Sequence, residues 1–136
     1  MGDGRAQARP VDTGLDLVAG EPYCYVTTVG RRSGRQHTIE IWFATDGTAL
    51  YLICGGGDRS DWVRNLQAAP QARVRVGDTV LDVTARVPLA EASERDLAVG
   101  LLHAKYRSQV TASVEAWQKN AFIVALDPQP TPGDAA

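Results

Sequence analysis

YCYVTTV at Tyr23–Val29, GRRSG at Gly30–Gly34 and TIEIWFA at Thr38–Ala44 follow one another closely in the chain. The first and last of these stretches are rich in β-branched and aromatic residues, which favour strands. Glycine and polar residues interrupt that pattern between them, as they do in turns. The sequence therefore predicts a β-hairpin with a basic tip.

The next segment continues the same pattern toward the C terminus. Asp46-Gly47 is a strong turn sequence between extended stretches, and Leu50–Cys54 reads as a third strand that runs into Gly55-Gly56-Gly57. We therefore expect three consecutive antiparallel strands.

A short helix is predicted immediately after these glycines. Ser60 is a candidate N-cap, Asp61 places an acid in the first turn, and Pro70 ends the helix soon afterwards. The helix should have two to three turns, and its sequence over Asp61–Leu66 is DWVRNL.

The second half of the chain predicts another hairpin, further helical sequence and a last strand. The hairpin turns at Gly77-Asp78, between the alternating stretches Arg73–Val76 and Leu81–Val87. Helical spacing runs over Glu91–Tyr106, less distinctly over Val114–Trp117, and a largely buried strand follows at Ala121–Leu126.

Five or six short antiparallel strands would leave a long exposed edge unless the sheet closed on itself. We therefore predict an α+β fold, a small antiparallel β-barrel with helices packed around it after the third and fifth strands. A parallel βαβ arrangement is disfavoured because the turns at Asp46-Gly47 and Gly77-Asp78 indicate hairpins. One domain is expected over residues 21–127, after a flexible N-terminal segment 1–20 and before a disordered tail 128–136.

Composition excludes several classes of protein. The chain has 136 residues, of which 44% are hydrophobic and 22% charged, so it is neither wholly disordered, collagenous nor a coiled coil. Its net charge of -2 provides no global field for nucleic acid, and the arginines near residue 31 lack interleaved aromatic residues. We expect no nucleic-acid partner.

Targeting and metal motifs are not apparent in the sequence. The start shows no secretory pattern and no run of about 20 apolar residues occurs, so a cytoplasmic protein without a transmembrane segment is expected. Cys24 and Cys54 lie in apolar runs and are expected to be buried thiols. With only these cysteines and the distant His37 and His103, no metal site is expected.

Two loops suggest chemistry. Between Glu21 and Glu40 the chain has no acid, whereas Arg31, Arg32, Arg35 and His37 surround one turn and raise its local potential. Such a cluster either binds an anion or simply keeps an exposed hairpin tip solvated. The second loop, Gly55–Gly57 ahead of a helix start, would let backbone N–H groups approach a phosphate, although it is neither a dinucleotide fingerprint nor a P-loop.

Taken in order, these motifs resemble the deazaflavin-dependent nitroreductase family. The resemblance rests on TTVGRRSG at Thr27–Gly34, the Asp46-Gly47 turn, GGG at Gly55–Gly57, and DWVRNL with Pro70 beyond it. It spans about Tyr23–Val87 and extends more weakly to Leu126. It implies a split β-barrel, coenzyme F420 as cofactor, and hydride transfer to a small organic acceptor such as a quinone, nitro compound or activated alkene.

The resemblance also implies a set of site residues. Cofactor-binding positions would be Gly30, Arg31, Arg32, Ser33, Gly34, Arg35, His37, Cys54, Gly55, Gly56, Gly57, Arg59, Ser60, Asp61, Trp62 and Asn65. Within the helix, Trp62 and Leu66 are expected to anchor to the core, which leaves Asn65 as the better polar contact. Tyr106 is the candidate catalytic residue, as a proton donor to the acceptor, or else a packing aromatic at the barrel rim.

The second strand differs from the family pattern, which commonly has Arg and Pro where this chain has His37 and Glu40. Those two side chains should face opposite sides of the strand, with Trp42 on the Glu40 face, where it either covers a ring or packs. Two alternatives remain at this point: an FMN-binding split-barrel oxidoreductase, and a non-catalytic binding protein for a deazaflavin, a flavin or another anionic small molecule. The acceptor and the oligomeric state are not determined by the sequence.

Overall fold

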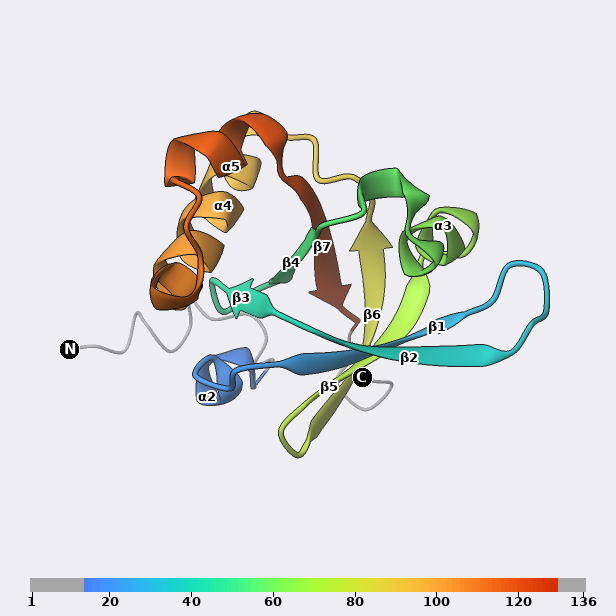
Figure 1. Ribbon diagram of the computed structural model, residues 1–136. Coiled ribbons are helices and arrows are strands. Elements are labelled where there is room, and N and C mark those ends of the chain that lie inside the picture. Colours follow the sequence, from blue (N-terminus) through green and yellow to red (C-terminus); the bar gives the residue numbers. More distant parts are fainter. Residues whose placement is uncertain (1–13, 130–136) are drawn as a thin grey trace.

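The computed structural model describes residues 14–129. Its elements run in the order α2 (Leu15–Val18), β1 (Cys24–Val29), β2 (Gln36–Ile41), β3 (Phe43–Thr45), β4 (Leu50–Cys54), a 3-10 turn (Gly57–Arg59), α3 (Asp61–Ala68), β5 (Gln71–Val76), β6 (Thr79–Arg86), α4 (Ala92–Tyr106), a second 3-10 turn (Arg107–Gln109), α5 (Val114–Asn120) and β7 (Phe122–Pro128) (Figure 1).

All seven strands form one antiparallel sheet in the order β2-β1-β5-β6-β7-β4-β3. Its two edge strands are consecutive along the chain, since only Trp42 separates β2 from β3. One bent segment therefore joins both edges of the sheet, which confirms the predicted small antiparallel barrel.

The strand expected over Thr38–Ala44 divides in two, and this correction explains the seventh strand. β2 pairs only with β1, whereas β3 pairs with β4 through Phe43↔Leu52. At the division, the Phe43 N–H donates to the Tyr106 hydroxyl at 3.1 Å. Within residues 14–129, β2 is therefore an edge strand bonded to β1 alone, and helix α3 packs against β1 near this edge (Figure 1).

The predicted turns have the conformations that their sequences require. Gly47 and Gly77 both adopt positive φ, 93° and 58°, which glycine accepts at little cost. Asp46 Oδ1 accepts from the N–H groups of Thr48 and Ala49 at 2.8 and 3.0 Å, which fixes the β3–β4 turn.

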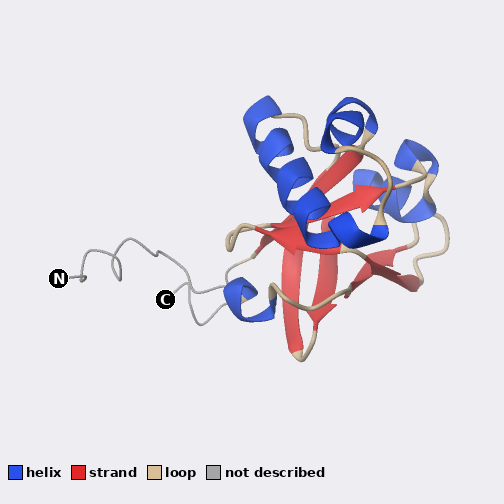
Figure 2. Cartoon of the chain, turned by 60° about the vertical axis from the view of Figure 1, so that its left-hand side comes forward, coloured by secondary structure: helices blue, strands red, loops and turns tan. Residues whose placement is uncertain are grey.

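Two apolar clusters hold the fold together. One fills the barrel and includes Val26, Leu52 and Leu66, while the other lies between the outer face of the sheet and helices α4 and α5 and includes Leu102 and Ile123. Figure 2 shows the helical segments gathered largely on one side of the strands. Cys24 and Cys54 are both free and buried, as expected.

At both ends, some residues of the expected terminal segments belong to ordered structure. Leu15, in the segment expected to be flexible, is fully buried in the barrel core within helix α2. At the other end, Pro128 belongs to β7, and the Gln129 N–H donates to Asp82 O at 2.8 Å. The rest of both expected terminal segments, residues 1–13 and 130–136, lies outside the described residues. No helix within residues 14–129 is long and apolar enough to cross a membrane.

Candidate functional site

The basic β1–β2 loop has a compact backbone. The Gly30 N–H donates to Arg35 O at 2.7 Å, and the Gly34 N–H donates back to Gly30 O at 2.9 Å. Gly34 has φ of +73°, which a residue with a side chain rarely adopts. The Arg35 N–H also donates to Ser33 Oγ at 3.1 Å. The loop thus holds its arginines on a defined scaffold rather than on a flexible tip.

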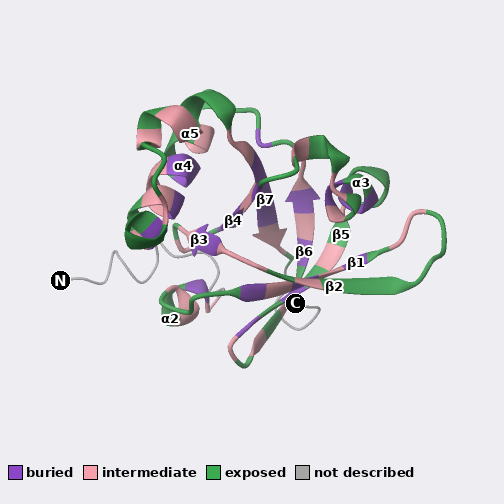
Figure 3. Ribbon diagram, in the orientation of Figure 1, coloured by how far each residue is buried: buried purple, intermediate pink, exposed green. Residues whose placement is uncertain are grey.

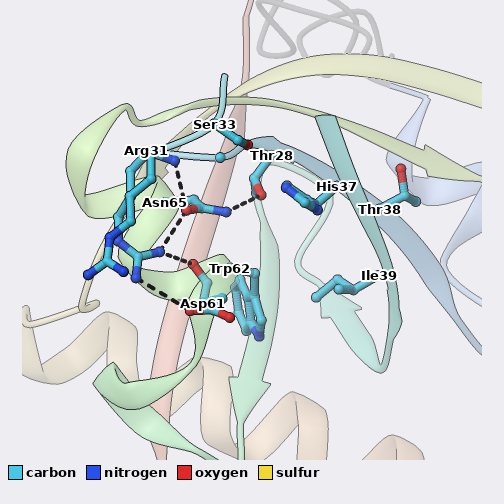
Figure 4. Close-up of a pocket in the computed structure, with 11 residues that line it drawn as sticks. Thr28, Arg31, Ser33, His37, Thr38, Ile39, Asp61, Trp62 and Asn65 are labelled. Carbon is cyan, nitrogen blue, oxygen red and sulfur yellow. Dashed lines mark hydrogen bonds and ion pairs between the residues drawn. The ribbon is translucent and has the colours of Figure 1, made fainter. Parts of the chain in front are cut away.

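Asn65 of α3 anchors this loop to the barrel. Only 4% of the residue is exposed. Its Oδ1 accepts from the Arg31 N–H at 3.2 Å and from Arg31 Nη1 at 2.9 Å, while its Nδ2 donates to Thr28 Oγ1 at 3.1 Å. Figure 4 shows these contacts converging on one side chain. Because a buried amide must have its hydrogen bonds satisfied, the contacts fix where Arg31 lies.

The arginines of the loop differ in how they are neutralised. Arg31 pairs with Asp61 at 3.4 Å, but Asp61 is well exposed, so the pair contributes little. Within the described residues, the side chains of Arg32 and Arg35 make no hydrogen bond or ion pair. The loop therefore presents uncompensated positive charge.

A pocket of about 470 Å³ opens between this loop, the β1–β2 hairpin and helix α3. It is lined by Thr28, Gly30, Arg31, Arg32, Ser33, His37, Thr38, Ile39, Asp61, Trp62 and Asn65. Figure 3 shows that the hairpin beyond the barrel body is largely exposed. The pocket lies beside β2, an edge strand that has no strand on its other side in the described part of the chain.

His37 lies close over Gly30 at the loop end of the pocket. A Cβ added to Gly30 would lie 2.7 Å from Ser33 Oγ and 3.1 Å from His37 Nε2. A side chain at position 30 would have to displace the Ser33 hydroxyl and the His37 ring, so glycine allows this close packing.

The structure brings together half of the predicted cofactor-binding residues. Those in the pocket lining are Gly30, Arg31, Arg32, Ser33, His37, Asp61, Trp62 and Asn65. Gly34 and Arg35 belong to the same loop but do not line the pocket. The lining also includes Thr28, Thr38 and Ile39, which the sequence reasoning missed. The hairpin register could have found Thr28, because it pairs directly with His37.

The segment Gly55–Gly57, which was expected to approach a phosphate, lies outside the pocket. Its residues do not line the pocket, and a 3-10 turn at Gly57–Arg59 separates Gly55 and Gly56 from α3. Arg59 is exposed on that turn. Ser60 occupies the N-cap position, but its side chain makes no capping bond and its Oγ lies 3.1 Å from Cys54 Sγ. These residues shape the entry to α3, and a phosphate-binding role for them stays a prediction.

Tyr106 lies away from the pocket, at the C-terminal end of α4. Its hydroxyl is within hydrogen-bond distance of Pro22 O at 2.8 Å and Phe43 O at 3.0 Å, and its ring stacks on Trp42 at 4.1 Å. Burial raises the pKa of this hydroxyl above its ordinary value. Because main-chain groups occupy the hydroxyl, the geometry favours the packing alternative over proton donation.

The chemistry of the pocket fits an anionic ligand. Arg31 and Arg32 supply hydrogen-bond donors and positive charge, His37 supplies ring nitrogens, and Trp62 and Ile39 supply apolar contact. Coenzyme F420, the cofactor that the resemblance implies, combines a flat ring with a phosphate and an acidic tail, and these two parts match the two kinds of lining. No group of His, Cys, Asp or Glu that could hold a metal ion occurs in the described part of the chain.

Comparison with solved structures gives the same fold. An F420-H2 dependent reductase shares 26% identity with a TM-score of 0.61, over 78% of this chain and 93% of its own. An F420 reductase shares 22% identity with a TM-score of 0.61, over 88% and 96% respectively. A FAD-binding protein from Mesorhizobium loti shares 13% identity with a TM-score of 0.59, over 85% and 86% respectively.

The sequence itself matches one family over most of its length. The match is to F420H2-dependent quinone reductase and covers residues 4–120. It confirms the resemblance drawn from the motifs and supports coenzyme F420 as the cofactor. With the split barrel and its cationic pocket in place, we conclude that this chain belongs to the F420H2-dependent quinone reductase family and is an F420-dependent oxidoreductase.

Proposed function

We propose that the protein reduces quinones at the expense of reduced F420, which it holds in the pocket between the β1–β2 hairpin and α3. The observation that carries this proposal is the cationic loop, anchored by Asn65 and left with two unpaired guanidinium groups, in a chain of the F420H2-dependent quinone reductase family. A solvated tip would not need a buried amide to fix one arginine.

When bound, reduced F420 supplies a hydride to the acceptor. The overall reaction would transfer one hydride and one proton from reduced F420 to the quinone, giving oxidised F420 and a hydroquinone. The protein has to bind the donor, orient its ring and admit the acceptor to one face. In this proposal Arg31, Arg32 and His37 hold the acidic groups of F420, and Trp62 and Ile39 contact its ring. Their shared position in the pocket lining supports these roles.

The test is a steady-state assay that follows oxidation of reduced F420 with three classes of acceptor. We expect naphthoquinones and benzoquinones to be reduced with higher kcat/KM than nitroaromatic compounds or activated alkenes. The Arg31→Ala variant should show a raised KM for reduced F420, whereas Arg73→Ala, whose arginine pairs with Asp82 on the opposite side of β1 from β2, should not.

Two results would contradict the proposal. Higher kcat/KM with a nitro compound or an activated alkene than with any quinone would reassign the acceptor. Tight F420 binding with no acceptor-dependent oxidation would indicate a non-catalytic binding protein instead.

A further inference from the structure

Strand β2 leaves one edge of the sheet open beside the pocket. Among residues 14–129, β1 lies on one side of β2 and no strand lies on the other. A strand at a sheet edge presents a row of main-chain N–H and C=O groups that pair with no neighbouring strand. The pocket reaches this edge, because its lining includes Thr38, the third residue of β2. Unpaired main-chain groups are therefore available to a bound ligand.

The hairpin register shows which residues of β2 turn their main-chain groups outward. The Gly30 N–H donates to Arg35 O at 2.7 Å, so these two residues form a hydrogen-bonded pair at the end of the hairpin. In an antiparallel ladder, such pairs alternate with pairs that do not bond to each other. The register continues this alternation, so His37 and Ile39 bond to β1, whereas the N–H and C=O of Thr38 point away from it.

Thr38 meets the pocket through its main chain and not through its side chain. Successive side chains of a strand point to opposite faces of the sheet. Figure 4 shows the side chains of His37 and Ile39 on one side of β2 and that of Thr38 on the other. On that other face, Thr38 Oγ1 lies 2.7 Å from Oγ1 of its cross-strand partner Thr27. The part of Thr38 that lines the pocket is therefore the open strand edge.

This edge suits a neutral ligand group that both accepts and donates hydrogen bonds. The arginines of the β1–β2 loop offer donors only, whereas the strand edge offers an N–H and a C=O. Flavin and deazaflavin rings carry such a group on one edge, a pyrimidinedione in which an N–H lies between two carbonyls. Ile39, which contacts the F420 ring in the proposed function, directly follows Thr38 in β2. The open edge thus lies beside the position proposed for the ring.

From this arrangement we propose that the main-chain N–H and C=O of Thr38 bind the pyrimidinedione edge of F420 and so orient its ring in the pocket. The inference rests on the proposed function, which places the ring beside Ile39. The ladder with β1 holds the main chain of Thr38 in place, so these groups fix the rotation of the ring in its own plane. Because flavins share this edge, preference for F420 over FMN depends on the cationic loop and not on Thr38.

The experiment measures amide hydrogen exchange by NMR in the free protein and in the protein saturated with oxidised F420. In the free protein, the outward amides of Gln36, Thr38 and Glu40 should exchange much faster than those of His37 and Ile39, which bond to β1. Saturation with F420 should slow exchange at Thr38 by at least about tenfold. Gln36 and Glu40 lie outside the pocket lining, so their exchange should not change.

Thr38→Pro tests the donor by a second route. Proline has no N–H, and an edge strand tolerates it where the N–H faces outward. The dissociation constant for F420, measured by fluorescence titration, should rise by about fivefold to tenfold. Thr27→Val is the matched control, because it removes the hydroxyl pair that Thr38→Pro also loses but keeps the Thr38 N–H. Thr27 lies outside the pocket lining, so this variant should bind F420 as the wild type does.

The outcomes separate the inference from the proposed function. If F420 saturates the wild type and exchange at Thr38 does not slow, or slows no more than at Gln36 and Glu40, the inference is overturned while the proposed function stands. Equal affinity of Thr27→Val and a folded Thr38→Pro would contradict the inference as well. The exchange measurement uses the wild type and so decides the question even if Thr38→Pro does not fold. If F420 does not bind the wild type, the proposed function fails and the inference fails with it.

Discussion

Arg86 and the arginines of the β1–β2 loop represent two opposite uses of the same side chain. Arg86 donates to Glu94 at 2.6 and 2.7 Å and to Asp127 at 2.7 and 2.9 Å, so two carboxylates satisfy its guanidinium. Arg32 and Arg35 have no such partner among the described residues, and Arg31 has one exposed carboxylate. A satisfied guanidinium joins elements of the fold, whereas an unsatisfied one is available to a ligand.

The Arg86 cluster joins several elements of the fold, which the loop arginines do not. Arg86 lies on β6, Glu94 on α4 and Asp127 on β7, and the Tyr51 hydroxyl of β4 also donates to Glu94 at 2.8 Å. This cluster therefore joins helix α4 to three strands. The loop arginines hold no other element together, apart from the contact of Arg31 with α3.

The largest effect is expected from breaking the Arg86 cluster. Arg86→Met should lower the free energy of unfolding by about 2–3 kcal/mol, because Glu94 and Asp127 would remain close together without a counter-charge. Urea denaturation followed by circular dichroism measures this loss. Affinity for F420 should be unaffected in the folded fraction, and a stability equal to the wild type would contradict the structural role.

The same cluster predicts a pH dependence. The hydrogen bonds from Arg86 hold the pKa of Glu94 below its ordinary value of 4.5. A carboxyl with a lowered pKa in the folded state stabilises the fold above its unfolded pKa and loses that contribution as pH falls. Wild-type stability should therefore decline below about pH 4.5 more steeply than that of Arg86→Met. Parallel curves for the two proteins would argue against this linkage.

Asn65 has both a structural and a binding role. It is buried in the fold, and its side chain also holds Arg31 of the β1–β2 loop. Asn65→Ala should destabilise the fold by about 1–3 kcal/mol and weaken F420 binding by about 1 kcal/mol, because Arg31 loses its anchor. Fluorescence quenching on F420 titration measures the affinity. Gln67→Ala, at an exposed position on the same helix, is the control and should change neither quantity. Loss of stability with unchanged affinity would mean that Arg31 needs no anchor.

Lys105 is a third kind of cation, which differs both from the paired Arg86 and from the loop arginines. Among the described residues it has no counter-ion, and it does not line the pocket beside β2. Its Nζ is buried without a hydrogen-bond partner among the described residues, 3.6 Å from the Phe43 ring centroid, and burial lowers its pKa to about 8. A lysine with a lowered folded pKa costs stability while charged and less as pH rises past that value. Stability should therefore increase between about pH 8 and 9. Part of this gain is offset near pH 9, because the Cys24 thiol has an ordinary pKa of 9.0 in the unfolded chain and burial raises its pKa to about 12 in the folded protein.

Lys105→Met should remove this pH dependence and raise the free energy of unfolding at pH 7 by about 1 kcal/mol. The gain is this small because the side chain is partly exposed and because the variant loses the cation–π contact. Thermal unfolding at pH 7, 8 and 9 tests it. A wild type whose stability is flat over this range would show that the amine is not desolvated.

The smallest effect is expected at Arg32. It is exposed and free of partners, so Arg32→Ala should leave stability within about 0.5 kcal/mol and weaken F420 binding by about 0.5–1 kcal/mol at low salt. This loss of F420 affinity should vanish at high salt, because salt already screens the attraction between Arg32 and the anionic ligand in the wild type. An equal loss at both salt concentrations would indicate a direct hydrogen bond instead.

Local sequence patterns were sufficient for most of the fold. Strand-forming residues around Gly30 and the turn at Asp46-Gly47 predict hairpins because short-range geometry decides them. The division of the second strand could not be predicted in this way. It depends on the Phe43 N–H meeting a hydroxyl 63 residues further along the chain. Likewise Leu15 lies in the segment that the sequence analysis expected to be flexible, and its burial depends on packing against the barrel core.

The residues of the candidate site that lie close together in the sequence could be predicted to cluster. Those that only the tertiary fold brings together could not. Arg31 and His37 belong to one turn, so their clustering is visible in the sequence. Asn65 reaches that turn only because α3 packs beside β1, 34 residues away. Gly55–Gly57 has the composition of a phosphate loop, but the 3-10 turn that follows separates it from the pocket.

The central claim is that the β1–β2 loop binds the anionic cofactor. The most direct test measures the dissociation constant for F420 at low and high salt, with FMN as the comparison ligand. The three proteins compared are the wild type, the double variant Arg31→Ala/Arg35→Ala and the control Arg73→Ala. We predict micromolar binding of F420 in preference to FMN, weakened by about 1–3 kcal/mol in the double variant and by salt, and unchanged in Arg73→Ala. Equal affinity in all three proteins would contradict the account and return these arginines to a solvated hairpin tip.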